Sequence, residues 1–466
     1  MSSVPQVAEA MQRVLTTHAK AMERATGFVE RSTAQLDGPI FAQMTVFGWM
    51  DNPEASYPQL RHVAASLDVP VSTQAVEQRF GAQSVALLRE LLHEAVGEVL
   101  CSEARVPEVL SRFSGVYVQD GTVISLPPEL AQAWRGCGGS TQDAGQSSLR
   151  VQVRLDLAHG GMQGPWLQAG REAERSGEAH EAPLPAGCLY NVDSGYFTLG
   201  EMRALGKAGC SWLTAAKAGI LLIDARGQCS SLVSFLCAQK SEEVDVQVWL
   251  GKRERLPVRL IARRVSPEQA KQRRAGAQRS KEGKPKGVQR PNERKRRAGD
   301  TRQRHRKRRK TAPARLQLLE WTILVTNVPP ALLSVDEALV LARCRWQIEL
   351  LWKLWKQVGK LDSWRSAKPD RILTEIYAKL LGCLMAHWLT LIECWQAPNR
   401  SLVQARQVVQ WMAPVLALGV AGVVPLASMV RRTSSSMATG CTVNARRKRP
   451  AAYQLVAQPK LIRGLG

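Results

Sequence analysis

Glu349 is the first residue whose surroundings suggest chemistry. It lies in the segment "ARCRWQIELLWKLWK", four residues after Arg345 and four before Lys353. Residues four apart share one face of an α-helix, so this carboxylate is held among cations. Taken alone, the arrangement is also typical of a surface helix with ordinary ion pairs.

Two aspartates are predicted to end strands, Asp120 in "YVQDG" and Asp193 in "NVDSG". A carboxylate there is costly unless a partner compensates it, and the glycine close behind each lets the backbone turn sharply, so we expect a turn at residues 120–121. Together with Glu349 on a helix packed against the sheet, they suit Mg²⁺, which takes oxygen ligands. Two such ions would activate a water or hydroxyl and stabilise the leaving oxygen in phosphoryl transfer.

The helix that carries Glu349 is predicted to have two faces. At about 100° per residue, one arc should meet the core and another should lie clear of it. The predicted core arc contains Cys344, Ile348, Leu351, Trp355 and Val358. The predicted outer arc contains Ala342, Arg345, Glu349, Trp352 and Lys356.

From Gly115 onward the pattern predicts a mixed α/β sheet. Strands are expected in "GVYVQDGTVISLP", "LRVQVRLDLAHGGMQGPWLQA" with a turn at residues 159–161, "CLYNVD", "SWLTAAKAG", "VDVQVWLG", "LPVRLIARRV" and "LEWTILVTNV". Thr198 and Glu201 form a capping box that predicts a helix over residues 199–207. After Pro330 the chain is expected to be helical nearly to its end.

Other acidic and titratable residues compete with this set. Asp156 is expected on the polar side of its strand with Arg150, Gln152 and Arg154, facing solvent or DNA. Ordinary packing or surface roles are expected for Asp362, Glu375 and His387.

The first hundred residues are predicted to be helical. Helices at about residues 60–67 and 73–80, joined by a short turn, would suit a helix-turn-helix. Ser72 would cap the second helix and direct four side chains outward, those of Thr73, Gln74, Glu77 and Gln78. An ordinary helical hairpin fits the same pattern.

The net charge of +24 favours a polyanionic partner, either nucleic acid or an acidic membrane surface. Residues 263–310 hold 21 Lys or Arg residues against four acidic ones, a surplus of 17 that leaves +7 for the rest. We expect the densest part to be a flexible arm, or a helix that orders on phosphate contact. A solvated insertion without a specific partner is the alternative.

The ten cysteines form no C-x-x-C pair, which favours reduced thiols in the cytosol and disfavours zinc fingers. No signal peptide is expected from the first residues. Residues 411–430 carry no charge but contain Pro414 and Pro425, so we expect a buried, interrupted core segment in preference to a membrane span.

The chain resembles the family-4 bacterial insertion-sequence transposases of the DDE superfamily. Their signature Tyr-x2-Arg-x3-Glu-x6-Lys is matched by Arg345, Glu349 and Lys356, with Ala342 at the tyrosine position. "YVQDGTVISLP" and "NVDSGYF" resemble the blocks that carry the first two acidic residues, and "WTILVTNVP" resembles the strand that re-enters the catalytic core. The resemblance spans about residues 115–395.

The resemblance implies an RNase H-like mixed-sheet catalytic domain with a β-rich insertion, flanked by helical regions. The expected parts are a helical DNA-binding domain (1–110), the first catalytic part (111–218), the insertion with its basic segment (219–318), the remaining catalytic part with Glu349 (319–395) and a C-terminal helical region (396–466).

The implied activity is cut-and-paste transposition, in which the ends are hydrolysed and the freed 3′-OH attacks target DNA. Asp120, Asp193 and Glu349 would bind two Mg²⁺ ions, for which Mn²⁺ can substitute. The expected DNA-contacting residues are Arg345, Lys353, Lys356, Thr73, Gln74 and Gln78. Partners would be the terminal inverted repeats, target DNA and a second copy of the chain in the synaptic complex, with no membrane, in the bacterial cytoplasm at the nucleoid. Alternatives are a nuclease of the same fold, a decayed transposase that only binds DNA, or an RNA-binding protein.

Overall fold

The computed structural model describes residues 4–31, 34–136, 146–282, 316–397, 399–444 and 450–465. The chain forms two compact units. The first unit contains Met1–Val192 and Arg343–Pro459, and the second contains Asp193–Ala342 and Lys460–Gly466. Both combine helices with a sheet, so the mixed α/β class is confirmed. The domain boundaries expected from the sequence stay a prediction.

The sheet of the first unit has the strand order β3-β2-β1-β4. Its strands are β1 (Val116–Leu126), β2 (Ser147–Asp156), β3 (Met162–Ala169) and β4 (Leu189–Val192). β1 runs antiparallel to β2 and parallel to β4, and β2 runs antiparallel to β3.

The turn predicted at Asp120 and Gly121 is wrong. β1 continues through both residues, with Asp120 opposite Val153 and Gly121 opposite Gln152 in an unbroken register from Tyr117 to Leu126. Asp-Gly is typical of a hairpin turn. Here the ladder with β2, which pairs both residues, keeps the backbone extended.

The polar side of β2 is buried, contrary to the prediction. Asp156 is only 5% exposed and accepts hydrogen bonds from the backbone N–H groups of Val116, Ala158 and His159. Arg154 is 2% exposed and donates to Gln119 and to the carbonyl oxygens of residues 179, 182 and 183. The segment around α8 (Glu178–Glu181) covers this face, and strand periodicity cannot reveal such a cover.

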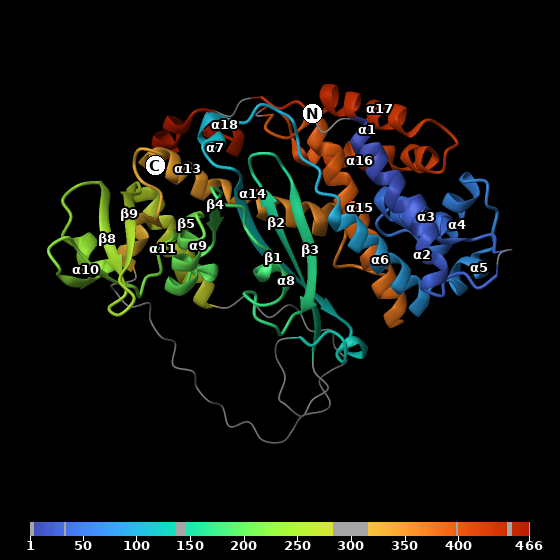
Figure 1. Cartoon of the computed structure of the whole chain (residues 1–466), viewed down its shortest axis with the longest axis horizontal. Helices are drawn as coiled ribbons and strands as arrows, with labels where there is room; N and C mark the ends of the chain where they lie inside the picture. Colours follow the sequence, from blue (N-terminus) through green and yellow to red (C-terminus); the bar gives the residue numbers. More distant parts are fainter. Residues whose placement is uncertain are drawn as a thin grey trace, which may run out of the picture. The chain divides into compact units, whose positions relative to one another are not determined.

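The helices of the first unit, which are labelled in Figure 1, supply most of its buried apolar side chains. They are α1 (Val4–Gln12), a π-helical stretch (Arg13–His18), α2 (Ala19–Ala25), α3 (Gly38–Asp51), α4 (Tyr57–Ser66), α5 (Thr73–Gln78), α6 (Ala82–Gly97), α7 (Glu108–Ser111), α14 (Trp346–Lys353), a second π-helical stretch (Leu354–Val358), α15 (Pro369–Glu393), α16 (Leu402–Val420), α17 (Leu426–Gly440) and α18 (Ala452–Ala457).

α15 is the central helix of this unit and contacts α3, α6, α16 and α17. It is long and apolar enough to cross a membrane, but 94% of its most apolar window is buried inside the protein, as in a core helix. The uncharged segment 411–430 is interrupted as predicted, because α16 ends at Val420 and α17 begins at Leu426. Its burial is incomplete, since Trp411 and Val423 are exposed.

His387 joins α15 to the turn between β2 and β3. Its Nε2 lies 2.7 Å from the carbonyl oxygen of Gly160, and since a carbonyl only accepts, Nε2 carries the proton. Gly160 has φ +76°, and a Cβ there would lie 2.5 Å from Leu391 and 2.7 Å from Trp395. Only glycine fits this close approach. Burial lowers the pKa of His387 to about 4.

The second unit contains six strands in the order β5-β10-β9-β8-β6-β7. Every pair that the structure describes in it is antiparallel. The strands are β5 (Ser211–Ala215), β6 (Leu221–Ile223), β7 (Cys229–Ser231), β8 (Glu243–Leu250), β9 (Leu256–Arg264) and β10 (Trp321–Thr326). The helices are α9 (Leu199–Lys207), α10 (Leu232–Cys237) and α11 (Pro267–Glu282), with 3₁₀ turns at Ser194–Tyr196 and Leu318–Glu320. The predicted helix over 199–207 is confirmed, with the Thr198 hydroxyl accepting from the Glu201 N–H.

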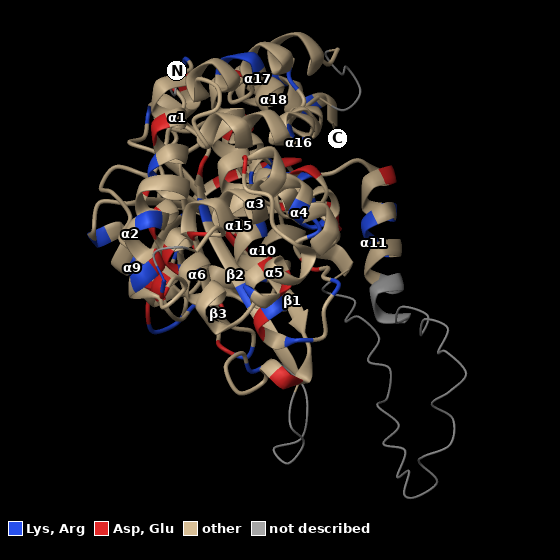
Figure 2. Cartoon of the chain, turned by 90° about the vertical axis from the view of Figure 1, so that its right-hand side faces the viewer, with Lys and Arg blue, Asp and Glu red and all other residues tan. Residues whose placement is uncertain are grey.

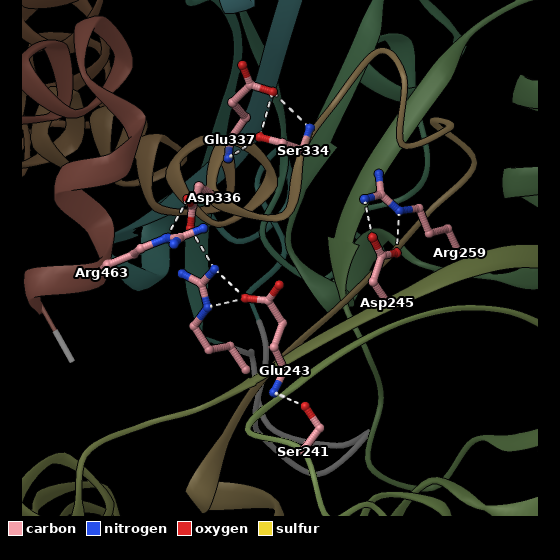
Figure 3. Close-up of polar contacts among 9 residues, drawn as sticks. Ser241, Glu243, Asp245, Arg259, Ser334, Asp336, Glu337 and Arg463 are labelled. Carbon is pink, nitrogen blue, oxygen red and sulfur yellow. Dashed lines mark hydrogen bonds and ion pairs between the residues drawn. The ribbon is translucent and has the colours of Figure 1, made fainter.

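Ion pairs tie distant segments of the second unit together (Figure 3). Arg259, which is 2% exposed, donates to both oxygens of Asp245 at 2.6 and 2.7 Å. Asp336 accepts from Arg263 at 2.6 Å and from Arg463 at 2.7 Å. Asp336 lies in the first turn of α13 (Val335–Cys344), so this carboxylate connects β9 and the C-terminal segment to the start of the helix that leads toward Glu349.

The buried His387 predicts a specific pH dependence of stability. Its folded pKa is about 4 and its ordinary value 6.5, so the unfolded chain takes up a proton first as the pH falls. The contribution of neutral His387 to the free energy of unfolding is therefore fully present above pH 6.5. It falls by about 3 kcal/mol as the pH drops from 6.5 to 4. Gln at position 387 keeps a donor for Gly160 without titrating, so the difference in unfolding free energy between parent and His387→Gln should narrow toward pH 4.5 in urea titrations.

His62→Gln is the matched control, because His62 is exposed on α4. Its unfolding free energy should run parallel to that of the parent from pH 7.5 to 4.5. A His387→Gln curve that also runs parallel to the parent would contradict the assignment.

Candidate active site

Asp120 occupies the middle of β1, in the first unit. Burial raises the pKa of its carboxyl group to about 6. The Gly121 N–H lowers that pKa, the charge of Glu174 raises it, Arg345 lowers it and Glu349 raises it again. This half-buried carboxylate therefore has two other carboxylates and one guanidinium within electrostatic reach.

Glu349 and Arg345 face each other on the adjacent helix. The Arg345 Nη2 donates to the Glu349 Oε1 at 2.9 Å, and both side chains are partly exposed. α14 packs against β1, and the Lys356 Nζ donates to the carbonyl oxygen of Val123, three residues beyond Asp120, at 3.0 Å. The structure thus brings together Asp120, Glu349, Arg345 and Lys356, while Lys353 is exposed on the same helix.

The helix that carries Glu349 is held by its apolar side. Helix α13 ends at Cys344 and α14 starts at Trp346, with Arg345 between them at the N-terminus of α14. The predicted core residues Cys344, Ile348, Leu351 and Trp355 are buried, and Val358 is half-buried.

Trp352 corrects the predicted outer arc. It is only 6% exposed, and its ring meets that of Trp355 edge to face at 5.3 Å. A large indole on the border of the apolar arc reaches the core, because helical side chains lean back over the preceding turn.

Asp193 directly follows β4 and is exposed. In the parallel ladder Gln119 pairs with Val192, so Asp120 and Asp193 are the next residues along two paired strands. Asp193 is the first residue of the second unit, whereas Asp120 and Glu349 belong to the first. Within the part of the chain that the structure describes, no three His, Cys, Asp or Glu side chains are close enough to hold a metal ion. The assignment of the three carboxylates as metal ligands stays a prediction.

Glu174 is a neighbour of Asp120 that the sequence analysis did not identify. Its Oε1 lies 3.6 Å from the Arg150 Nη1 and 3.2 Å from the position that a Cβ on Gly121 would occupy. Gly121 therefore leaves the space that this side chain uses. No motif marks Glu174, which lies in an irregular segment after β3; only the pairing of β3 with β2 brings it near β1.

Helices α4 and α5 form the predicted pair. The Ser72 hydroxyl accepts from the Ala75 N–H as expected, and Gln74 and Gln78 are exposed while Thr73 is half-buried. Glu77 is not free, since Arg371 of α15 donates to it at 2.7 Å. DNA reading by this pair stays a prediction.

The basic segment 263–310 is only partly described. Its first residues end β9 and form α11, where Lys and Arg are marked in Figure 2. Arg273 donates to the carbonyl oxygen of Trp321 at 2.9 Å, and Arg274 pairs with Glu320, so part of this charge binds the protein itself. Residues 283–310, the densest part, lie outside the described residues.

The nine cysteines that the structure describes are free thiols, as predicted. Glu375, for which a packing role was expected, is buried on α15 and pairs with Lys379 at 2.7 Å. Lys379 also donates to the carbonyl oxygens of Lys360 and Ser363, which fixes the loop after the Glu349 helix. Asp362, in that loop, is exposed.

Comparison with known proteins adds independent information. The model of a family described as "Transposase DDE domain" matches residues 111–386. The transposase for insertion sequence element IS231E of Bacillus thuringiensis subsp. finitimus is 22% identical over 347 residues, which cover 70% of this chain and 66% of that relative, slightly under two thirds of its length.

Two further relatives are similar over a longer stretch. The transposase for IS231B of Bacillus thuringiensis subsp. berliner is 22% identical over 384 residues, or 78% of this chain and 74% of the relative. The transposase for IS1151 of Clostridium perfringens is 21% identical over 390 residues, or 77% and 75%. Because the family match covers more than half of the chain and includes Asp120, Asp193 and Glu349, this protein belongs to the family of transposases with a DDE domain.

Proposed function

We propose that this protein is a cut-and-paste DNA transposase that cleaves the ends of an insertion sequence and joins the freed 3′-OH to target DNA. The observation that carries the proposal is the placement of Asp120 and Glu349 on adjoining faces of β1 and α14, within electrostatic reach of each other, in a chain that matches the transposase DDE domain. The same match supports an RNase H-like catalytic core.

The donor set supports a divalent cation. Asp120 is half-buried, and the neighbouring carboxylates of Glu174 and Glu349 repel its charge, so a cation would relieve an existing electrostatic cost. Asp120, Asp193 and Glu349 would hold two Mg²⁺ ions, or Mn²⁺ in their place. When bound, such ions activate the attacking oxygen and stabilise the leaving oxygen of the phosphodiester.

The basic residues would position DNA at this site. Lys356 uses one of its three N–H donors on the carbonyl oxygen of Val123, which leaves donors for a phosphate. Arg345 is paired with Glu349 through one nitrogen, and its planar fork can grip two phosphate oxygens. Lys353, which is exposed on α14, would add a third cationic side chain to Arg345 and Lys356. The terminal repeats would be read by the N-terminal helices, with Thr73, Gln74 and Gln78, and pairing two element ends calls for a dimer on DNA.

Removal of each proposed ligand should abolish both chemical steps. Asp120→Ala, Asp193→Ala and Glu349→Ala should each reduce cleavage of the element's own ends by at least about a hundredfold, because transition-state charge stabilisation is lost. The measurement is strand cleavage with Mg²⁺ present or chelated, followed by joining of a pre-cut end to target DNA.

Asp362→Ala is the control, since Asp362 is exposed and has no proposed role. Unchanged cleavage in all three variants would contradict the metal site. Cleavage without joining of the pre-cut end would indicate a nuclease, and a parent protein that binds the ends but never cleaves them would indicate a DNA-binding protein.

A second prediction tests metal binding through thermal stability and needs no activity assay. Without Mg²⁺ at pH 7.5, Asp120→Asn should be more stable than the parent by a few degrees in melting temperature, because a half-buried charge that Glu174 and Glu349 repel is removed. Mg²⁺ should raise the melting temperature of the parent, since a ligand that binds only the folded state stabilises it. The variant should respond much less.

Asp362→Asn supplies the matched control, and its response to Mg²⁺ should equal that of the parent. If Mg²⁺ shifted parent and Asp120→Asn by the same amount, binding at Asp120 would be ruled out.

A further inference from the structure

A cavity lies in the first unit, behind the helix that carries Glu349. It has a volume of about 40 Å³ and is bordered by α14 and the π-helical stretch after it, α15, α16 and β2. Most of its wall is apolar, formed by Leu155, Leu351, Leu354, Trp355 and Ala386. Arg406 of α16 also lines it, and we call it the Arg406 cavity. None of the proposed metal ligands borders it.

Arg406 is a buried charge without a counter-charge. It is 5% exposed, and its Nε and Nη1 have no hydrogen-bond partner among the described residues. None of the described carboxylates is within ion-pair distance of it. An unpaired charge in an apolar setting is strongly destabilising, so proteins pair such groups or supply an ion.

The nearest polar neighbour cannot supply that charge. The thiol of Cys383, which also lines the cavity, lies within electrostatic reach of Arg406. Burial raises the pKa of this thiol above its ordinary value although Arg406 lowers it, so the thiol stays neutral at pH 7. The guanidinium charge is left unbalanced.

The other polar residues of the wall are Gln347, His387, Thr390 and Trp395, and among the described residues the Trp395 indole offers an unused donor. Trp395 is 4% exposed, and its Nε1 has no partner among the described residues. The Nε2 proton of His387 is used by Gly160, and the Thr390 hydroxyl donates to the carbonyl oxygen of His387. A ligand here therefore meets a cation and an indole N–H, which suit an anion with acceptor oxygens.

We propose that the Arg406 cavity binds a small monocarboxylate of about the size of acetate. The carboxylate balances the Arg406 charge with a charge-assisted hydrogen bond, and the methyl group contacts the apolar wall. About 40 Å³ is room for about three water molecules, which matches a ligand of four heavy atoms. Because Leu351 and Leu354 form part of the wall, the occupied site stabilises the helix of Glu349 from its apolar side. The inference does not depend on the proposed transposase activity.

Thermal unfolding of the full chain tests this with sodium acetate as the probe. Acetate at tens of millimolar should raise the melting temperature by about 2 °C more than sodium chloride at the same ionic strength and pH. Acetamide, which is the same size but neutral, should have no such effect. Hydrogen exchange of residues 346–358 should slow in acetate. An equal shift with chloride would show a site for any small anion, and no shift with either would show a cavity filled by water; both results overturn the proposal.

Substitutions in the wall test whether the acetate response arises at the Arg406 cavity. Arg406→Met removes the charge at similar length, so it should lose the acetate response and should be at least as stable as the parent in chloride. Arg431→Met, at an exposed arginine of α17, is the matched control and should keep the response. Leu354→Phe fills the cavity, keeps Arg406 and should also abolish the response. An acetate shift that survives in both Arg406→Met and Leu354→Phe would place binding elsewhere and refute the site.

Discussion

The first unit depends on a carboxylate held in the interior of a paired strand. Asp120 lies where β1 bonds to β2 on one edge, while the parallel ladder with β4 ends one residue earlier on the other. The backbone around it therefore cannot move to relieve the charge. The compensation has to come from other groups, namely the Gly121 N–H and Arg345. Helix α14 is thus needed beside β1 for two reasons: it packs against the strand, and Arg345 at its start offsets the charge of Asp120.

Charged groups buried in the sheet near Asp120 are also compensated by neighbouring groups. Arg154 and Asp156 are buried on one strand, and each is saturated with hydrogen bonds, Arg154 to carbonyl oxygens and Gln119, Asp156 to backbone N–H groups and the ring of His159. A fully satisfied buried polar network rigidifies the elements that it joins. Arg154 fixes the segment around α8 over the sheet and Asp156 closes the β2–β3 turn, so both hold the end of β2 that pairs with the strand around Asp120. Arg406 differs from both, because the described residues leave its charge unbalanced.

Patterns within a few residues correctly predicted many helices and strands. The predictions that were wrong depend on contacts between residues far apart in the sequence. The capping box at Thr198, the Ser72 cap and the strands β8 to β10 follow from spacing within a few residues. The acids Asp120 and Glu349 were found because motif and strand pattern coincide. The continuation of β1 through Asp-Gly, the burial of Asp156 and the burial of Trp352 depend on what covers each face, which no window of sequence contains. Glu174 was missed for the same reason, since two successive strand pairings bring it to Asp120.

Ala342 occupies the tyrosine position of the motif, so other residues must hold the Glu349 helix in position. Ala342 lies in α13, before the break at Arg345, and is half-buried. The contacts that hold α14 on β1 come after the break: Ile348 and Trp355 in the core, and Lys356 on the carbonyl oxygen of Val123. The pair of Arg345 with Glu349 likewise forms without residue 342. A side chain at position 342 is therefore not needed to align the carboxylate, and the loss of a tyrosine there removes a hydroxyl and a ring from the site while leaving its frame intact.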